Sequence, residues 1–318
     1  MIKKIQGDDR VIRYYKTVGN KVEKIQSIEE GCWVNCVKPT DSEINYILNT
    51  CNVNPEFIRA SLDEEESSRI DREEENSLII IDNPVVNKSG KNLTYYTTPL
   101  SIIITPHNII TISLKETHVL EEFEESLIKN TNINDKNRFA LQIMLRVAGK
   151  YLKYLKQINK ITERVEEELK KSMKNKELIQ FLEIEKSLVY FSASLKSIGV
   201  MLGRMGRGKY INLNEEQYEL LEDVIIEIKQ ATEMSEIYLN ILNGTMDAFA
   251  SIISNNLNIV MKVLASITLI LSIPTIISGI YGMNNPRIPM IEYWWFPLGL
   301  SAVSMFITWI ILKHKNML

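Results

Sequence analysis

The feature that most constrains this chain is an uncharged stretch near its C-terminus. No residue from Val263 to Tyr281 carries a charge, and Lys262 comes directly before it. A helix rises about 1.5 Å per residue, so about 20 apolar residues are enough to cross a bilayer. A second uncharged stretch, residues 293–312, follows after a short loop. Together the two stretches predict a transmembrane helical hairpin.

Small and polar residues recur through the first stretch at alternating steps of three and four. Residues at that spacing share one side of a helix. Lipid offers such groups no partner, so they face another helix or a water-filled lumen. Packing against a neighbouring helix explains isolated residues of this kind, whereas an unbroken row indicates the wall of a pore. The polar row consists of Asp247, Ser251, Ser254, Asn258, Met261, Ala265, Thr268, Ser272, Thr275 and Gly279.

The two ends of this stretch carry recognisable motifs. Residues 281–284 read Tyr-Gly-Met-Asn, and residues 258–262 read Asn-Ile-Val-Met-Lys. Both resemble the corresponding motifs of the CorA-type magnesium transporters, at the same places in the first of two C-terminal spans. The resemblance is specific over the last third of the chain and architectural before it. It implies a homopentamer in which the polar row faces the axis and the second span faces lipid.

The resemblance also implies roles for residues along the row. Mg²⁺ gives up its inner waters reluctantly, and neutral oxygens at Gly282 and Asn284 can accept hydrogen bonds from those waters. Conduction needs sites weak enough for the ion to leave. Met261, with Leu264 or Ala265, is the expected apolar constriction that gates by dewetting. The expected pore and selectivity residues are Gly282, Met283, Asn284, Thr275, Ser272, Thr268 and Asn258.

Charge is distributed unevenly along the chain. Nearly all of it precedes Val263, and the first ten residues lack the apolar core of a signal peptide. Lys262 before the hairpin, and Lys313 and Lys315 after it, place both termini in the cytoplasm by the positive-inside rule. We expect a multi-pass protein of the cell membrane. Its expected partners are copies of itself and membrane lipid, with no nucleic acid.

The first part of the chain has the pattern of a small α/β domain. Segments rich in β-branched residues predict strands, and the pairs Thr40 with Glu43 and Asn54 with Pro55 predict the starts of two helices. A polar segment at 87–92 predicts a hairpin loop. The expected strands are residues 11–18, 32–37, 77–82, 99–105 and 109–113.

From about Asn137 the hydrophobic period becomes that of helices. The predicted fold class is an α+β cytoplasmic domain followed by long helices and a C-terminal two-span transmembrane helical hairpin, and the resemblance implies a homopentameric funnel. The expected divisions are a cytoplasmic α/β domain at 1–130, an antiparallel helical pair at 131–212, a stalk helix at 213–262, a pore-lining helix at 263–284, an outer loop at 285–292, and a second span with a basic tail at 293–318.

Acidic residues gather between positions 63 and 75. A solvated surface explains such a run, and a hard-cation site is the alternative, because Mg²⁺ prefers carboxylate and water oxygens. The resemblance implies that acids here and on a neighbouring subunit's long helix bind regulatory cations that hold the pore closed. The expected metal residues are Asp223, Asp247, Asp63 and Glu64, with Mg²⁺ as both the transported and the regulatory ion.

Other chemistries find little support in the sequence. Cys32, Cys36 and Cys51 suit a reducing compartment and indicate core positions, because no companion pair stands at metal-ligand spacing. No nucleophile–base arrangement is present, so we expect no enzyme and no organic cofactor. The favoured function is divalent-cation transport, with magnesium influx first and cobalt and nickel possible. The alternatives are a proton-coupled zinc transporter of the same architecture, and a membrane-anchored sensor or scaffold without transport.

Overall fold

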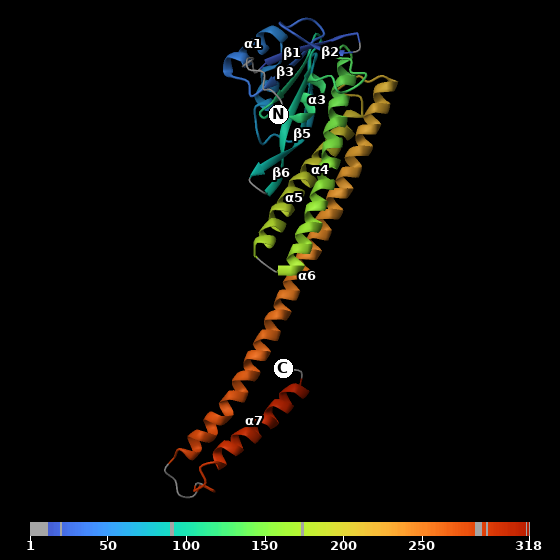
Figure 1. Ribbon diagram of the computed structural model, residues 1–318. Helices are drawn as coiled ribbons and strands as arrows, with labels where there is room; N and C mark the ends of the chain where they lie inside the picture. The colour runs from blue at the N-terminus through green and yellow to red at the C-terminus, as the bar shows by residue number, and fades with distance from the viewer. Residues whose placement is uncertain are drawn as a thin grey trace. The chain divides into compact units, whose positions relative to one another are not determined.

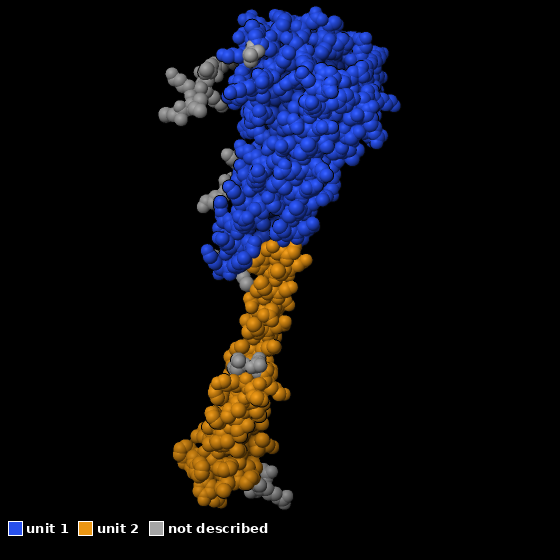
Figure 2. Space-filling view, turned by 90° about the vertical axis from the view of Figure 1, so that its right-hand side faces the viewer, with its two compact units in different colours: residues 1–243 blue, residues 244–318 orange. Residues whose placement is uncertain are grey.

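The computed structural model divides into two compact units, residues 1–243 and residues 244–318 (Figure 2). Helix α6, Glu215–Tyr281, begins in the first unit and ends in the second. The residues that the structure describes are 12–19, 21–89, 92–172, 175–283, 288–290, 292–315 and 317.

The first unit is built on a mixed sheet that has seven strands within the described residues. Their order across the sheet is β2-β1-β3-β7-β6-β5-β4, and only the β3–β7 pair is parallel. The strands are β1 Ile12–Val18, β2 Lys21–Ile25, β3 Trp33–Val37, β4 Arg69–Glu73, β5 Asn76–Ser89, β6 Asn92–Ile104 and β7 Ile109–Ser113.

Helices cover both faces of this sheet, which explains why its central strands are apolar throughout. Helices α1, Asp41–Cys51, and α2, Pro55–Ser61, pack on one face over a core that includes Val34 and Phe57. Both begin as the sequence predicts: the Thr40 backbone nitrogen donates to Glu43 at 2.8 Å, and the Asn54 side chain accepts from Glu56.

The opposite face of the sheet meets α3, His118–Glu124, α4, Lys136–Ser172, and α5, Asn175–Met205 (Figure 1). The Trp33 ring stacks edge-on against Phe139 with 5.2 Å between centroids, and its indole nitrogen donates to Thr111 at 2.8 Å. Residues 215–243 of α6 continue this layer, because Leu221, Val224 and Ile228 are buried in the first unit.

The structure differs from the sequence prediction at the edges of the sheet. Strand β4 falls inside the acidic segment, and strand β2 was not expected at all. Both are short, charged and at the two ends of the strand order, where charge discourages pairing with other chains. The hairpin loop predicted at 87–92 is shorter in the structure, because β5 and β6 stay paired as far as Ser89 and Asn92.

The second unit holds the remainder of α6 and helix α7, Phe296–His314. These are the two helices that are long and apolar enough to cross a membrane within the described residues, and little of either apolar window is buried. Exposed apolar surface of this extent requires an apolar environment. The presence of two such helices, α6 and α7, at the C-terminal end of the chain confirms the predicted fold class for this part.

Candidate cation pathway

One side of α6 packs against α7 in the second unit. The Ser266 hydroxyl donates to the Met317 carbonyl oxygen at 3.0 Å, and the Tyr281 and Phe296 rings lie 6.0 Å apart. Ser266 is fully buried, and Ile273 and Ile277 are half-buried on the same side. On α7 the corresponding buried residues are Ser301 and Leu312. These contacts form the intrachain seam of the hairpin.

The polar row lies outside this seam on α6. Each residue turns a helix by about 100°, so Thr268 points roughly opposite to the seam, while Ala265 and Ser272 lie about a third of a turn away from it. Ala265 and Thr268 are exposed and Ser272 is half-buried. The row therefore does not serve the packing of α6 on α7, and this intrachain seam does not explain why it is polar.

The hydroxyl groups of the row donate their protons to carbonyls of α6 itself, which leaves the hydroxyl oxygens free to accept hydrogen bonds. Thr268 donates to the Leu264 carbonyl at 2.9 Å, and Ser272 donates to Leu269 at 2.8 Å. Thr275 makes the same kind of bond to its own helix, at 3.3 Å. Each hydroxyl proton is used within the helix, so the oxygen lone pairs remain to accept from water. The row presents neutral acceptors, which suit a hydrated cation.

The end of α6 is closely packed at the predicted signature. The Gly282 nitrogen donates to the Ser278 carbonyl at 2.8 Å, and a Cβ at position 282 would stand 3.0 Å from that same oxygen. A larger residue would push the backbone apart at this position. Met283 is 62% exposed, and Asn284 lies outside the described residues.

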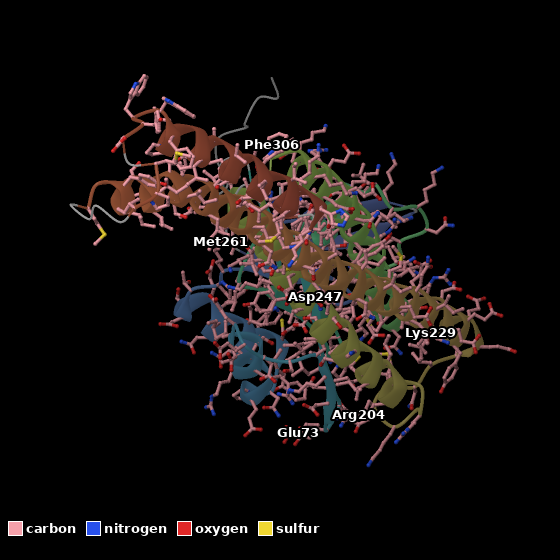
Figure 3. The ribbon with its side chains drawn as sticks, turned by 90° about the horizontal axis from the view of Figure 1, so that it is seen from below. Glu73, Arg204, Lys229, Asp247, Met261 and Phe306 are labelled. Carbon is pink, nitrogen blue, oxygen red and sulfur yellow. The ribbon has the colours of Figure 1, made fainter. Side chains whose placement is uncertain are left out.

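The expected gate residues lie on exposed parts of α6. Met261 and Leu264 are each 56% exposed, and Ala265 is exposed beside them. Asn258 is one turn before Met261, and Asp247 lies further back on the same helix (Figure 3). Around a shared axis of several chains, Met261 and Leu264 would form an apolar ring next to a polar ring of Asn258. A narrow apolar ring can gate a pore by dewetting.

The expected regulatory acids do not form a metal site within one chain. Among the described residues, no group of three or more His, Cys, Asp or Glu side chains is placed to hold a metal ion. Asp63 and Glu64 are exposed in the turn after α2, where an Asp63 oxygen accepts from the Glu65 nitrogen at 2.9 Å. Asp223 is exposed on α6 in the same unit. Any cation site that uses these acids needs ligands from elsewhere.

The cysteines occupy the core positions that the sequence predicts. All three are free and buried, Cys32 and Cys36 completely so. Burial is also the main cause that raises the pKa of the Cys51 thiol to about 11. Protonated, buried thiols are poor metal ligands, because the metal requires the thiolate.

Sequence reasoning did not identify the residues of the seam. Ser266, Ile273, Ile277 and Tyr281 follow one another at steps of seven, four and four, which is a helical face like that of the row. That spacing was visible in the sequence.

Comparison with known proteins identifies the family of the chain. A family model described as "CorA-like Mg2+ transporter protein" matches residues 29–314. The cobalt/magnesium transport protein CorA of Methanocaldococcus jannaschii is 26% identical over 286 residues, which cover 86% of this chain and 87% of that protein. The protein of the same name from Thermotoga maritima is 24% identical over 221 residues, 68% of this chain and 63% of that protein.

A solved structure supports the same assignment at the level of the fold. The complete structure of the CorA magnesium transporter from Methanocaldococcus jannaschii matches with a TM-score of 0.86 and 22% identity, covering 98% of this chain and 100% of that one. The family model describes a transporter, not an enzyme, and spans both candidate membrane helices. The chain is a multi-pass membrane protein that belongs to the CorA-like Mg²⁺ transporter family.

Proposed function

We propose that several copies of this chain enclose a central pore that conducts hydrated Mg²⁺ into the cell. The observation that carries the proposal is the position of the polar row on α6, outside the seam with α7. One hairpin cannot surround a path for ions, whereas a ring of α6 helices in cyclic symmetry can. Five copies is the number that the family resemblance implies.

In such a ring, the outer end of the row selects the ion by its hydration shell. Neutral oxygens at Gly282, Met283 and Asn284 accept hydrogen bonds from the waters of Mg²⁺ without stripping them. Thr275, Ser272 and Thr268 continue the path with acceptors of the same kind, and Asn258 offers an amide at its inner end. Neutral groups bind weakly enough to release the ion, as conduction demands.

Closure of the pore takes place at the apolar residues next to Asn258. Met261 and Leu264, with Ala265, exclude water when the α6 helices approach one another. Lys262, Lys313 and Lys315 lie on the side of the hairpin that we assign to the cytoplasm, by the positive-inside rule. Both termini then lie in the cytoplasm, with residues 285–292 outside.

The proposal is tested by flux in reconstituted vesicles. The full chain should admit Mg²⁺, and Co²⁺ or Ni²⁺ as related ions, without a pH gradient. Zinc flux that requires a proton gradient would favour the alternative transporter, and absence of flux for every ion would leave only the sensor or scaffold. The measurement is fluorescence of an entrapped divalent-cation indicator.

A substitution at the signature separates the pore from its scaffold. Asn284→Ala should abolish Mg²⁺ flux while the oligomer still assembles, because it removes only the amide at the mouth. Asn255→Ala is the matched control, an exposed α6 asparagine that is not part of the row. Retained flux in Asn284→Ala, measured beside an unaffected control, would contradict the assigned mouth.

A further inference from the structure

A cleft of about 810 Å³ lies in the first unit, between the β5–β6 hairpin, α3 and α4. None of the residues assigned to the pore or to its regulation lines this cleft. Small-molecule sites commonly have volumes of about 300–1,000 Å³. The cleft has room for a ligand of ordinary metabolite size, and its lining indicates which kind.

The rim of the cleft is basic. Lys150, Lys153, Lys160 and Arg164 follow α4 at steps of three, seven and four, so they share one face of the helix. Lys150 pairs with Glu122 at 2.6 Å, whereas within the described residues no ion pair joins the other three to a carboxylate.

Few negative charges oppose this rim. The carboxylates that line the cleft are Glu116 and Glu121, and Glu121 lies 2.6 Å from His118. With Lys150 neutralised by Glu122, the three cations Lys153, Lys160 and Arg164 face two carboxylates, a local excess of positive charge in a chain whose net charge is −3. Such a surface favours an anion.

The floor of the cleft combines apolar side chains with one unsatisfied polar group. Val85, Val86 and Leu93 supply apolar surface, and Leu93 is 39% exposed. Asn83 also lines the cleft and is only 2% exposed, yet its side-chain oxygen has no hydrogen-bond partner within the described residues. A buried acceptor without a partner is rare in folded proteins, and a donor on a ligand would satisfy it.

From this cleft we infer a binding site for a nucleoside polyphosphate. The base lies against the apolar floor and donates an exocyclic N–H to the Asn83 oxygen, while the phosphates lie along Lys153, Lys160 and Arg164. Lys153 and Arg164 stand eleven positions apart, about 16 Å of helix. This is longer than a triphosphate chain, so their long side chains would converge on it from both ends. Inorganic phosphate would use the rim alone, and an uncharged ligand would leave the cations unpaired.

The test is calorimetric titration of the full chain in detergent, with EDTA present, using ATP, tripolyphosphate and adenosine as separate probes. ATP should bind more tightly than either of the other two, because only ATP engages both rim and floor. Equal or tighter binding of tripolyphosphate would overturn the assignment of a nucleoside, and absence of ATP binding would overturn the site.

Variants locate the binding. Lys153→Ala with Lys160→Ala should weaken ATP about tenfold or more, through the loss of two charge-assisted contacts. Arg146→Ala with Lys156→Ala is the matched control, because both are exposed α4 cations outside the cleft. Asn83→Leu should weaken ATP and leave tripolyphosphate unchanged. Equal losses in the rim pair and the control pair would overturn the site, and circular dichroism verifies that each variant is folded.

Discussion

At the scale of single residues, Asp82 is a carboxylate held inside the sheet. It is 8% exposed on β5, and the Ser68 hydroxyl donates to it at 3.0 Å. Burial raises the pKa of Asp82 above its ordinary value of 3.8, and the hydrogen bonds from Ser68 and Ser194 lower it only in part. The folded chain therefore holds this proton more tightly than the unfolded chain does.

The pH dependence of stability follows from that difference. Between the ordinary pKa and the raised one, the folded state binds more protons than the unfolded state, so stability falls as pH rises. Asp82→Asn removes the ionisation. The gain in unfolding temperature of this variant over the wild type should grow from about pH 4 upward and then level off. A gain that shrinks with pH, measured by near-UV circular dichroism, would contradict the sign.

The buried cysteines give a second expectation. Cys32 and Cys36 are completely buried, and burial raises the pKa of the thiols at both positions. A thiol reagent attacks the thiolate, so the native chain should label about 100-fold more slowly than the chain unfolded in denaturant. The readout is mass spectrometry of maleimide adducts over time. Rapid stoichiometric labelling of the native chain would show that these positions open to solvent.

At the scale of elements, the contrast between the two sides of α6 is the strongest support for a pore. Ser266 and Ile273 lie in the seam with α7, and Ala265, Thr268 and Ser272 lie away from it. From the sequence alone the polarity of the row was evident. The family resemblance implied that the row faces the pore axis, but its direction relative to α7 was not evident, because that depends on where α7 packs.

Cysteine substitution along α6 tests this contrast. Cysteines at 265, 268 and 272 should react with a membrane-impermeant methanethiosulfonate and block flux, since water in the pore ionises the thiol. Cysteines at 266 and 273 should react at least about tenfold more slowly. The natural cysteines are buried, so the wild type is the background. Equal reactivity of both groups would contradict a water-filled row.

Local sequence signals predicted most elements of the sheet domain and missed those that depend on position in the sheet. Helices α1 and α2 begin at capping residues, which are local chemistry. Strands β2 and β4 are edge strands whose charged residues suit solvent, so their sequences carry no apolar alternation to detect. The cleft beside α4 was not predicted from the sequence either, because only tertiary packing brings Asn83 and the cations of α4 into the lining of one cleft.

At the scale of the whole molecule, the acids assigned to regulation need a second chain. Asp63 and Glu64 are exposed in one turn, Asp223 is exposed on α6, and the described residues assemble no metal site from them. Exposed acids of neighbouring copies repel one another, and a bridging divalent cation removes that repulsion. We propose that internal Mg²⁺ holds the subunits together in the closed state, with Asp247 as a further acid on α6.

The regulatory proposal predicts a change in inhibition without a change in conduction. Asp63→Asn with Asp223→Asn should raise the internal Mg²⁺ concentration that halves flux by about tenfold or more, because the cation loses two anionic ligands. Maximal flux at low internal Mg²⁺ should stay as in the wild type, since neither residue lies on the polar row. Flux into vesicles preloaded with graded Mg²⁺ measures both quantities.

A control pair decides whether these two positions or surface charge in general matters. Glu125→Gln with Glu167→Gln removes the same charge from exposed positions on the same unit, so it should leave the inhibitory concentration unchanged. Equal shifts in both pairs would mean that Mg²⁺ only screens a diffuse negative field. An unchanged inhibitory concentration in the Asp63 and Asp223 pair would place the regulatory site elsewhere. Only a shift confined to that pair supports cations that bridge neighbouring subunits.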